Sequence, residues 1–385
     1  MIHQPKLHPH TGRFHHFADA TLHFIQKNVV LTVAIFLALL TSCIVPPDAQ
    51  YASYFDWKTL TCLFCTLAVV CALKNIRFFT ILARKIVDCT GNLRIAVIAL
   101  VYITFLGSML ISNDMALLTF LPLGYFVLSS TGKEKHMAFV FIMQNIAANL
   151  GGMLTPFGNP QNLYLYSKFN IPTGEFMQIM LIPFLAAIAL ITICCLFLPR
   201  EKLTIATLCT ERLPVKRTVL YLILFVLSIV VVFRAIPYVV GLILIPAVLL
   251  FADRKTLKDV DYPLLATFFC FFIFAGNMAR IPAVSELFSS LLEKNTLIFS
   301  ILSCQIISNV PSAILLSQFT ADYPALLLGV NIGGTGTLIA SLASLIAFRE
   351  YTAHNPGKAG SYLAKFSAYN FGFVAILTAI SWCIL

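Results

Sequence analysis

The sequence predicts an all-α polytopic membrane protein with about nine full spans, built as an inverted repeat with two re-entrant hairpins and two broken helices. Three observations predict this class. Of the 385 residues, 59% are hydrophobic and 11% are charged, whereas about a quarter of the residues of a soluble domain are charged. Long uncharged apolar runs divide the chain, and a bilayer span needs about 20 such residues. Polar motifs then recur at matching places in the two halves of the chain.

Twelve apolar runs leave no room for a large soluble domain between them. They cover residues 28–47, 59–73, 95–113, 115–132, 137–167, 176–199, 218–233, 235–252, 262–279, 295–321, 323–348 and 366–385. The first run follows 27 polar, histidine-rich residues and ends at Pro46-Pro47 without a small-residue cleavage pattern. We therefore expect a retained span there and not a signal peptide.

Two stretches predict hairpins that enter and leave the membrane on the same side. Run 295–321 is too long for one ordinary helix and too short for two, and residues 308–312 in its middle read Ser-Asn-Val-Pro-Ser. Proline at such a position breaks a helix. Runs 95–113 and 115–132 flank Ser112-Asn113-Asp114 in a similar way.

Removing both hairpins leaves nine spans, so the two termini lie on opposite faces. With a cytoplasmic N-terminus, 21 of the 26 lysines and arginines fall in inner segments, as the positive-inside rule requires. We predict a multi-pass protein of the plasma (inner) membrane with an external C-terminus. The formal charge of +10 then reflects orientation in the lipid bilayer, and no nucleic-acid partner is expected.

An internal repeat relates the two halves. Residues 56–65 parallel residues 261–270, and each copy leads through an amphipathic connector to a Ser-Asn tip. Gly151-Gly152 then matches Gly333-Gly334. The predicted division is a cytoplasmic tail (1–27), a first repeat (28–198), a linker with an extra span (199–235) and an inverted second repeat (236–385).

Two tips and two glycine-broken stretches thus interrupt regular helix at membrane depth. Non-helical backbone survives there only when it is buried in protein or lines a wet cavity, and paired breaks in inverted halves are typical of a transporter binding site. Helix N-termini at such breaks suit an anion, while hydroxyl, amide and carbonyl oxygens suit Na⁺. The pattern predicts a small anionic substrate and a coupling cation.

Asp114 is the only carboxylate deep inside an apolar run. An intramembrane acid is by default a functional candidate, here a proton carrier or a Na⁺ ligand. Its alternative role is a helix N-terminal cap. The second tip carries Val310 at the matching position, so one ionisable site is expected and not two.

The predicted binding residues are those of the two tips and the two breaks. They are Ser112, Asn113, Asp114, Gly151, Gly152, Thr155, Gly158, Asn159 and Asn162 in the first half, with Ser308, Asn309, Pro311, Ser312, Gly333, Gly334, Thr335, Thr337, Ser341 and Ser344 in the second. The Ser-Asn pairs have an alternative role as caps of the second hairpin arms. Asn145 and Asn149 are interpreted as helix-packing contacts.

These motifs resemble the ion transporter superfamily, in particular its citrate-transporter-like and arsenite-permease-like branch, which is related to divalent anion–sodium symporters. The resemblance covers roughly residues 28–385 and is carried by 111–114, 147–162, 308–311 and 333–344. It implies an elevator-type homodimer in which a scaffold holds a mobile transport domain. The symporters carry Ser-Asn-Thr at both tips, whereas Asp114 and Val310 stand there in this chain. The resemblance also implies Na⁺ ligands, at Ser112, Asn113, Gly158, Ser308, Asn309 and Ala340.

The predicted function is a secondary active transporter, or permease, for a small carboxylate or oxyanion, coupled to Na⁺ or H⁺. No enzyme is expected, because G-x-S-x-G, H-E-x-x-H and P-loop signatures are absent from the sequence, and no cofactor is expected beyond the coupling ion. The alternatives are a cation/proton antiporter of the same superfamily and a non-transporting membrane sensor. Six of the eight histidines lie in residues 1–23, where a disordered tail is favoured over a metal site.

Overall fold

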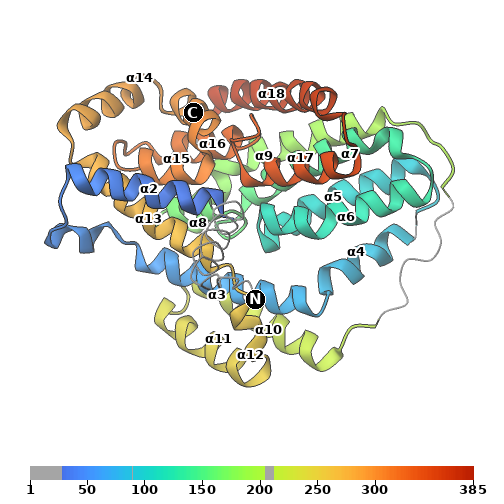
Figure 1. The fold of residues 1–385 in the computed structure, drawn as a ribbon, viewed down its shortest axis with the longest axis horizontal. Coiled ribbons are helices and arrows are strands. Elements are labelled where there is room, and N and C mark those ends of the chain that lie inside the picture. The colour runs from blue at the N-terminus through green and yellow to red at the C-terminus, as the bar shows by residue number, and fades with distance from the viewer. Residues whose placement is uncertain (1–27, 89, 204–211) are drawn as a thin grey trace, which may run out of the picture.

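The computed structural model describes residues 28–88, 90–203 and 212–385, and all of its regular elements are helices (Figure 1). No strand occurs within these ranges; one isolated antiparallel bridge joins Asn92 and Lys202. The predicted histidine-rich tail, residues 1–27, lies outside the described residues. The predicted all-α class is therefore confirmed for the described part of the chain.

The apolar runs of the first half coincide with helices. The elements are α2 (Val29–Ile44), η1 (Ala49–Tyr54), α3 (Trp57–Asn75), α4 (Phe78–Asp88), α5 (Leu93–Ile111), α6 (Asn113–Ser130), η2 (Glu134–His136), α7 (Met137–Gly151), η3 (Gly152–Leu154), α8 (Pro160–Lys168) and α9 (Thr173–Leu196).

The second half and its preceding linker helix follow the same pattern. The elements are α10 (Val215–Val232), α11 (Tyr238–Ala252), α12 (Arg254–Lys258), α13 (Tyr262–Ala279), α14 (Pro282–Ile307), α15 (Asn309–Leu316), α16 (Tyr323–Gly333), α17 (Leu342–His354) and α18 (Ala359–Ile384).

Seven helical segments of the described chain are long and apolar enough to cross a bilayer, as expected for a polytopic membrane protein. They are Trp57–Asn75, Leu93–Ile111, Glu134–Leu154, Thr173–Leu196, Val215–Val232, Arg254–Ala279 and Ala359–Ile384. The helices α2, α11 and α16 are also apolar but have only 16, 15 and 11 residues. The nine-span arrangement stays a prediction, because these seven include α5, an arm of a predicted hairpin.

The two aligned segments of the predicted repeat begin as helices with the same N-cap. The Asp56 side chain accepts a hydrogen bond from Thr59 N at 2.9 Å, and the Asp261 side chain accepts one from Leu264 N at 3.1 Å. Aspartate at the N-cap satisfies one of the free N–H groups of the first turn. Residues 56–65 and 261–270 therefore match in local structure as well as in sequence.

Each Ser-Asn tip is a one-residue break between two helices. Ser112 (φ 71°, ψ 157°) separates α5 from α6, and Ser308 (φ 76°, ψ 160°) separates α14 from α15. This backbone region is normally open only to glycine, and strain of this kind gathers at functional sites. Because α5 packs on α6 and α14 packs on α15, the helices of each pair lie side by side.

The predicted start of the second hairpin coincides with a kink in α14. Asn295 has extended backbone (φ −169°, ψ 96°) inside the helix, and its Oδ1 accepts a hydrogen bond from Ile298 N at 2.7 Å. Asn295 therefore acts as an N-cap for the part of α14 that runs to Ser308. The preceding part, from Pro282 to Lys294, corresponds to the predicted polar connector.

The two halves exchange their first helices. The first helix of the first half, α2, packs against α13, whereas α11, the first helix of the second half, packs against α3. Asn277 Nδ2 donates to Thr41 Oγ1 at 3.3 Å in the first of these contacts. Asn75 Nδ2 donates to Asp259 Oδ2 at 3.3 Å near the second. Each half therefore covers part of the other.

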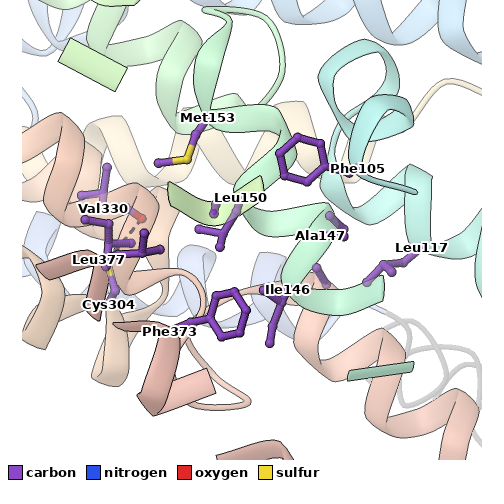
Figure 2. Packing of buried hydrophobic residues seen from close by; sticks show 14 of the residues in the cluster. Phe105, Leu117, Ile146, Ala147, Leu150, Met153, Cys304, Val330, Phe373 and Leu377 are labelled. Atoms are coloured by element: carbon purple, nitrogen blue, oxygen red, sulfur yellow. Dashed lines mark hydrogen bonds between the residues drawn. The ribbon is translucent and has the colours of Figure 1, made fainter. Parts of the chain in front are cut away.

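The larger buried apolar cluster surrounds α7, in which every residue except Phe139 is buried. Figure 2 shows Leu150 on this helix among apolar side chains that include Phe105 of α5, Val330 of α16 and Phe373 of α18. A helix that is buried all round lies at the centre of its domain.

A second apolar cluster joins α3, α4, α10 and α11 to one side of α5 and α6, and Figure 1 shows α10, α11 and α12 at the lower edge.

Candidate functional site

The first tip, Ser112-Asn113-Asp114, lies between α7 and α17. Asn113 Nδ2 donates to Asn149 Oδ1 on α7 at 3.2 Å. The helix that begins at this tip, α6, also packs against α17. The segment that begins at the first tip therefore also contacts the broken helix of the second half.

The first break runs from Thr155 to Asn159, after η3 and before α8. The break ends at Asn159, because residues 160–162 form the first turn of α8. Proline fits this position, since the first helical residue needs no N–H partner. The Asn162 amide then closes the loop: its Nδ2 lies 3.1 Å from Gly152 O, 3.2 Å from Met153 O and 3.4 Å from Thr155 O.

Three glycines let oxygen atoms approach the backbone of this break. A Cβ at Gly152 would lie 2.4 Å from Asn159 Oδ1, and a Cβ at Gly158 would lie 2.8 Å from Thr155 Oγ1. Gly151 packs on α5 so closely that a Cβ there would lie 2.2 Å from Phe105 O. Any side chain at these positions would displace oxygen atoms of the loop or of α5.

At the first tip and the first break, three oxygen atoms are buried and have no hydrogen-bond partner among the described residues. They are Asp114 Oδ1, Thr155 Oγ1 and Asn159 Oδ1, and the Thr155 and Asn159 residues are only 7% and 1% exposed. Leaving a buried polar atom unpaired costs about 1–3 kcal/mol, and native proteins have few such atoms. Carboxylate, hydroxyl and amide oxygens are the ligands that hard cations prefer.

A cavity of about 20 Å³ lies where the first tip meets the first break. Ser112, Phe157 and Asn159 line one side, and Thr66 and Leu67 of α3 line the other. This volume holds about one water molecule. Ser112 of the tip and Asn159 of the break therefore border the same small cavity, whose other lining residues are mainly apolar.

The second tip packs directly on the second break. The Ala340 carbonyl accepts hydrogen bonds from Asn309 N at 2.9 Å and from Ser308 Oγ at 3.2 Å. A Cβ at Gly334 would lie 2.9 Å from Asn309 Nδ2. Hydrogen bonds to the Ala340 carbonyl and close packing at Gly334 thus join the tip and the break of the second half.

The second break runs from Gly334 to Ser341, between α16 and α17. Ser341 caps α17, since its side chain accepts from Ser344 N at 3.2 Å. Thr337 bonds to Gln305 of α14, and the buried Thr335 Oγ1 has no partner within the described ranges. Gly333 is the last residue of α16, and a Cβ there would lie 2.9 Å from Cys304 Cβ.

Two predicted site residues serve the second helix pair instead of the break. Ser312 Oγ pairs with Ser303 Oγ at 2.8 Å, which joins α15 to α14. Pro311 is buried in the first turn of α15. The remaining predicted residues gather around the ends of α7, α8, α16 and α17.

Buried asparagine side chains connect this region across the two halves. Asn331 Nδ2 donates to Asn162 Oδ1 at 2.6 Å, and Asn159 Nδ2 lies 3.4 Å from Asn331 Oδ1. The chain of contacts continues through Asn149, Asn145 and Asn370, with Asn149 Nδ2 at 3.3 Å from Asn145 Oδ1 and Asn145 Nδ2 at 3.5 Å from Asn370 Oδ1. The interpretation of Asn145 and Asn149 as helix-packing contacts agrees with these bonds.

Asn331 and Asn370 are polar residues that the sequence interpretation missed. A signal for Asn331 exists: it stands two residues before Gly333, as Asn149 stands two residues before Gly151. Nothing comparable marks Asn370, which is a polar residue inside the apolar helix α18.

Comparison with known proteins places this geometry in a family. Residues 21–326 match the family described as citrate transporter, a range that contains both tips and the first break. An uncharacterized transporter of Methanocaldococcus jannaschii is 33% identical over 316 residues, which cover 81% of this chain and 86% of that protein. The chain belongs to the citrate transporter family. It is therefore a membrane transporter, and the resemblance seen in the motifs is confirmed.

Two further relatives of this citrate transporter family member are bacterial. An inner membrane protein of Escherichia coli is 28% identical over 338 residues, covering 85% of this chain and 89% of that protein. An uncharacterized transporter of Haemophilus influenzae is 35% identical over 127 residues, covering 32% of this chain and 28% of that protein.

The linker of this transporter reaches the end of α8. Arg234, at the turn between α10 and α11, donates from Nη2 to Tyr166 O and from Nη1 to Ile171 O at 3.2 Å. Its guanidinium carbon lies 4.0 Å from the centre of the Tyr166 ring. Phe233 makes an edge contact with Phe157 of the first break, with ring centres 5.7 Å apart. The linker thus contacts both ends of the segment that contains the first break and α8.

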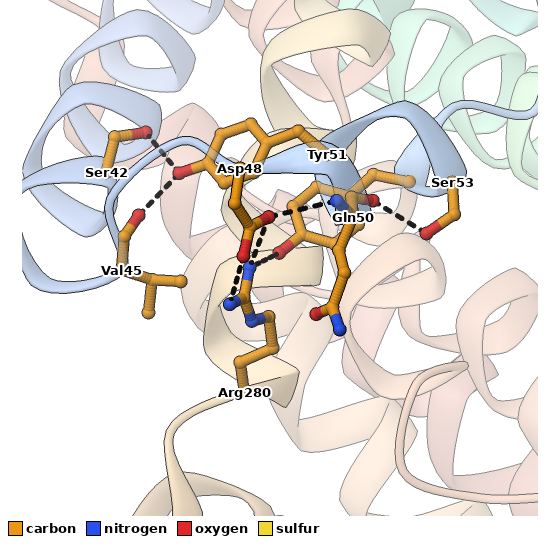
Figure 3. A network of polar contacts seen from close by, with 8 residues as sticks. Ser42, Val45, Asp48, Gln50, Tyr51, Ser53 and Arg280 are labelled. Carbon is orange, nitrogen blue, oxygen red and sulfur yellow. Dashed lines mark hydrogen bonds and ion pairs between the residues drawn. The ribbon is translucent and has the colours of Figure 1, made fainter.

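Ion pairs lie outside the apolar segments of the transporter. Figure 3 shows Arg280 beside Asp48, where Nη2 and Oδ2 are 2.7 Å apart and Arg280 Nη1 lies 3.0 Å from Tyr54 OH. The Arg280 guanidinium holds the pKa of the Asp48 carboxyl below its usual value. Lys133 and Lys135 both pair with Glu201, and their ammonium groups lower the pKa of the Glu201 carboxyl to about 2.

Proposed function

We propose that this transporter is a permease that moves a small anion, a carboxylate or an oxyanion, across the plasma (inner) membrane together with Na⁺ or H⁺. The observation that carries the proposal is the set of buried oxygens without partners at Asp114, Thr155 and Asn159. They belong to the first tip and the first break, where they have no evident role in folding. A coupling cation would supply the missing partner.

Helix N-termini support the anionic substrate. Among the described helices, α6 and α15 begin at the tips, and α8 and α17 begin at the breaks. The free N–H groups and the dipole of a helix N-terminus favour negative charge. A substrate between the tips would therefore meet positive partial charge from several directions, without any lysine or arginine in the site.

We further propose an inverted repeat with nine spans and two re-entrant hairpins. The exchange of α2 and α11 between the halves, the matching aspartate N-caps and the equal strain at Ser112 and Ser308 support it. The domain boundaries at residues 198 and 236 follow the predicted division.

The two apolar clusters support an elevator mechanism. The tips and breaks surround α7, whereas α3, α4, α10 and α11 form a separate cluster. We propose the bundle around α7 as the mobile domain and the second cluster as the scaffold of a homodimer.

We propose a cytoplasmic N-terminus and an external C-terminus, and contacts among the charged segments support the grouping of loops by side on which this orientation rests. Glu201 pairs with Lys133 and Lys135, which joins two segments assigned to the inner side. Arg280 pairs with Asp48, which joins two segments assigned to the outer side. Glu350 and His354, which also pair, are both assigned to the inner side.

Uptake by purified transporter in proteoliposomes tests the proposal. The substrate panel is a set of radiolabelled carboxylates and oxyanions, first selected by thermal shift with Na⁺ and pH varied. Asn113→Ala and Asn309→Ala are each expected to abolish uptake, while Asn355→Ala, at the C-terminal end of α17, is expected to leave it unchanged. If both tip variants transport at the wild-type rate, the site assignment is wrong.

A cation/proton antiporter is the second candidate, because Asp114 is an ionisable residue whose Oδ1 is buried without a partner among the described residues. It predicts that Na⁺ alone, without an organic or inorganic anion substrate, dissipates a pH gradient across the vesicle membrane. Asp114→Asn is expected to abolish that signal. A gradient that collapses only when an anion is added favours the anion permease.

A further inference from the structure

The second break is filled by a side chain of the transporter itself. Gln305 lies on α14, three residues before Ser308, and its amide enters the break. Its Nε2 donates to Gly333 O and to Ile301 O, both at 2.9 Å. Its Oε1 accepts from Thr337 N at 2.8 Å. Both ends of the amide are thus bonded to backbone groups, two of which belong to Gly333 and Thr337 at the break.

A glycine provides the space that this amide occupies. A Cβ at Gly336 would lie 1.9 Å from Gln305 Oε1 and 2.5 Å from Gln305 Cδ. Thr337 also donates from Oγ1 to Gln305 O at 3.2 Å. The amide and the break therefore fit together without room for another group at Gly336.

The other groups expected to bind a cation in the second half are engaged as well. The Ala340 carbonyl already accepts from Asn309 N and from Ser308 Oγ. Thr335 Oγ1 is the buried oxygen of this break that has no partner within the described part of the chain. One hydroxyl does not make a cation site, because hard cations take several oxygen ligands at once.

The first half has no amide at the position that matches Gln305, although Asn162 of α8 donates to the carbonyls of Gly152, Met153 and Thr155. Met109 stands three residues before Ser112, where Gln305 stands before Ser308, and it packs against the apolar cluster around α7. A thioether neither donates to carbonyls nor accepts strongly from N–H groups. The side-chain oxygens of Thr155 and Asn159 stay without partners in this half.

We infer that Gln305 replaces a second coupling cation, so that the transporter binds one cation per chain, in the first half at Asp114, Thr155 and Asn159. The NH₂ group of the amide supplies to the carbonyls of Gly333 and Ile301 the positive partial charge that an ion would supply. A cation in the second break would have to displace three hydrogen bonds. The inference rests on the cation coupling of the proposed function and specifies its stoichiometry and its location.

Counting ²²Na⁺ bound to the purified full-length transporter in detergent tests the inference. The wild type is expected to bind one Na⁺ per chain. Thr155→Val is expected to weaken this binding at least tenfold, whereas Thr335→Val leaves it unchanged. Gln305→Ala and Gln305→Met, which both remove the amide from the carbonyls, are expected to raise the count toward two.

The outcomes separate this inference from the function on which it rests. Two Na⁺ ions per wild-type chain, or one ion that is lost in Thr335→Val and kept in Thr155→Val, would overturn the inference and leave cation coupling intact. A wild type that binds no Na⁺ would overturn the sodium-coupled form of the proposed function as well. A Gln305→Ala protein that still binds the first Na⁺ is folded, so a count of one in that variant also contradicts the role of Gln305.

Discussion

Asn331 Nδ2 donates to Asn162 Oδ1 at 2.6 Å, which joins the helix before the second break to the first turn of α8. The same Nδ2 lies 2.8 Å from Leu327 O, and Asn331 Oδ1 faces Asn159 Nδ2 at 3.4 Å. All three asparagines are at most 1% exposed. The loop of the first half is therefore held by a side chain of the second half.

Replacing Asn331 by alanine is expected to lower the free energy of unfolding by about 1–3 kcal/mol, because the amide groups of Asn159 and Asn162 stay buried without this partner. Thermal unfolding in detergent, followed by intrinsic fluorescence, measures the change. The matched control is Asn355→Ala, since Asn355 is half-buried and its side-chain amide donates to Met137 Sδ and to Tyr351 O. Equal losses in the two variants would contradict the bracing role of Asn331.

Replacing Gly152 by alanine is expected to abolish uptake, because the new Cβ would lie 2.4 Å from Asn159 Oδ1 and would push that side chain out of the break. Gly174→Ala is the control, since nothing lies within 4 Å of a Cβ there. Proteoliposome uptake measures both variants. Wild-type uptake by Gly152→Ala would show that the position of the Asn159 side chain is irrelevant to transport.

Replacing Arg234 by alanine is expected to destabilise the protein by about 1.5–3 kcal/mol, the range found for hydrogen bonds to charged groups. Arg234→Lys keeps the charge but not the planar fork, so an intermediate loss is expected. Thermal unfolding of both variants is compared with Arg254→Ala, in the first turn of the short helix α12. A lysine variant as stable as the wild type would mean that charge alone holds the linker to α8.

Removing the Glu201 carboxylate tests the ion pairs with Lys133 and Lys135 through their dependence on pH. The pKa of Glu201 falls from 4.5 to about 2 in the folded protein, so the pairs stabilise the fold above pH 4.5 and lose this effect as the pH falls toward 2. The midpoint of thermal unfolding of Glu201→Gln is therefore expected to lie below that of the wild type at pH 7. The gap should close between pH 4.5 and 2; a gap that stays constant would contradict the ion-pair explanation.

Helix positions are predictable here because their causes are local. Apolar runs without charge, aspartates at N-caps and prolines in first turns mark nearly every boundary, including the kink at Asn295. The start of α8 also has a local cause. Pro160 counts as a helix breaker in a motif, yet its ring and missing N–H suit the first residue of α8.

The residues of the candidate site are predictable as a set, because polar side chains and paired glycines are conspicuous in apolar surroundings. Their partners are not. Asn145 and Asn370 are 225 residues apart in the chain, and no local pattern specifies that they meet. The entry of Gln305 into the second break depends in the same way on how α14 packs against α16.

The pairing of α2 with α13 has a consequence for biosynthesis. Thr41 and Asn277, which bond across this contact, are 236 residues apart. At a translation rate of about 5–20 residues per second, α2 emerges roughly 10–50 seconds before its partner exists. During that interval the side chains of Thr41 and Ser42 lie in the lipid or at the insertion machinery without their hydrogen-bond partner Asn277. A ribosome that stalls before α13 would therefore leave a nascent chain whose first helix is still unpaired and open to quality-control recognition.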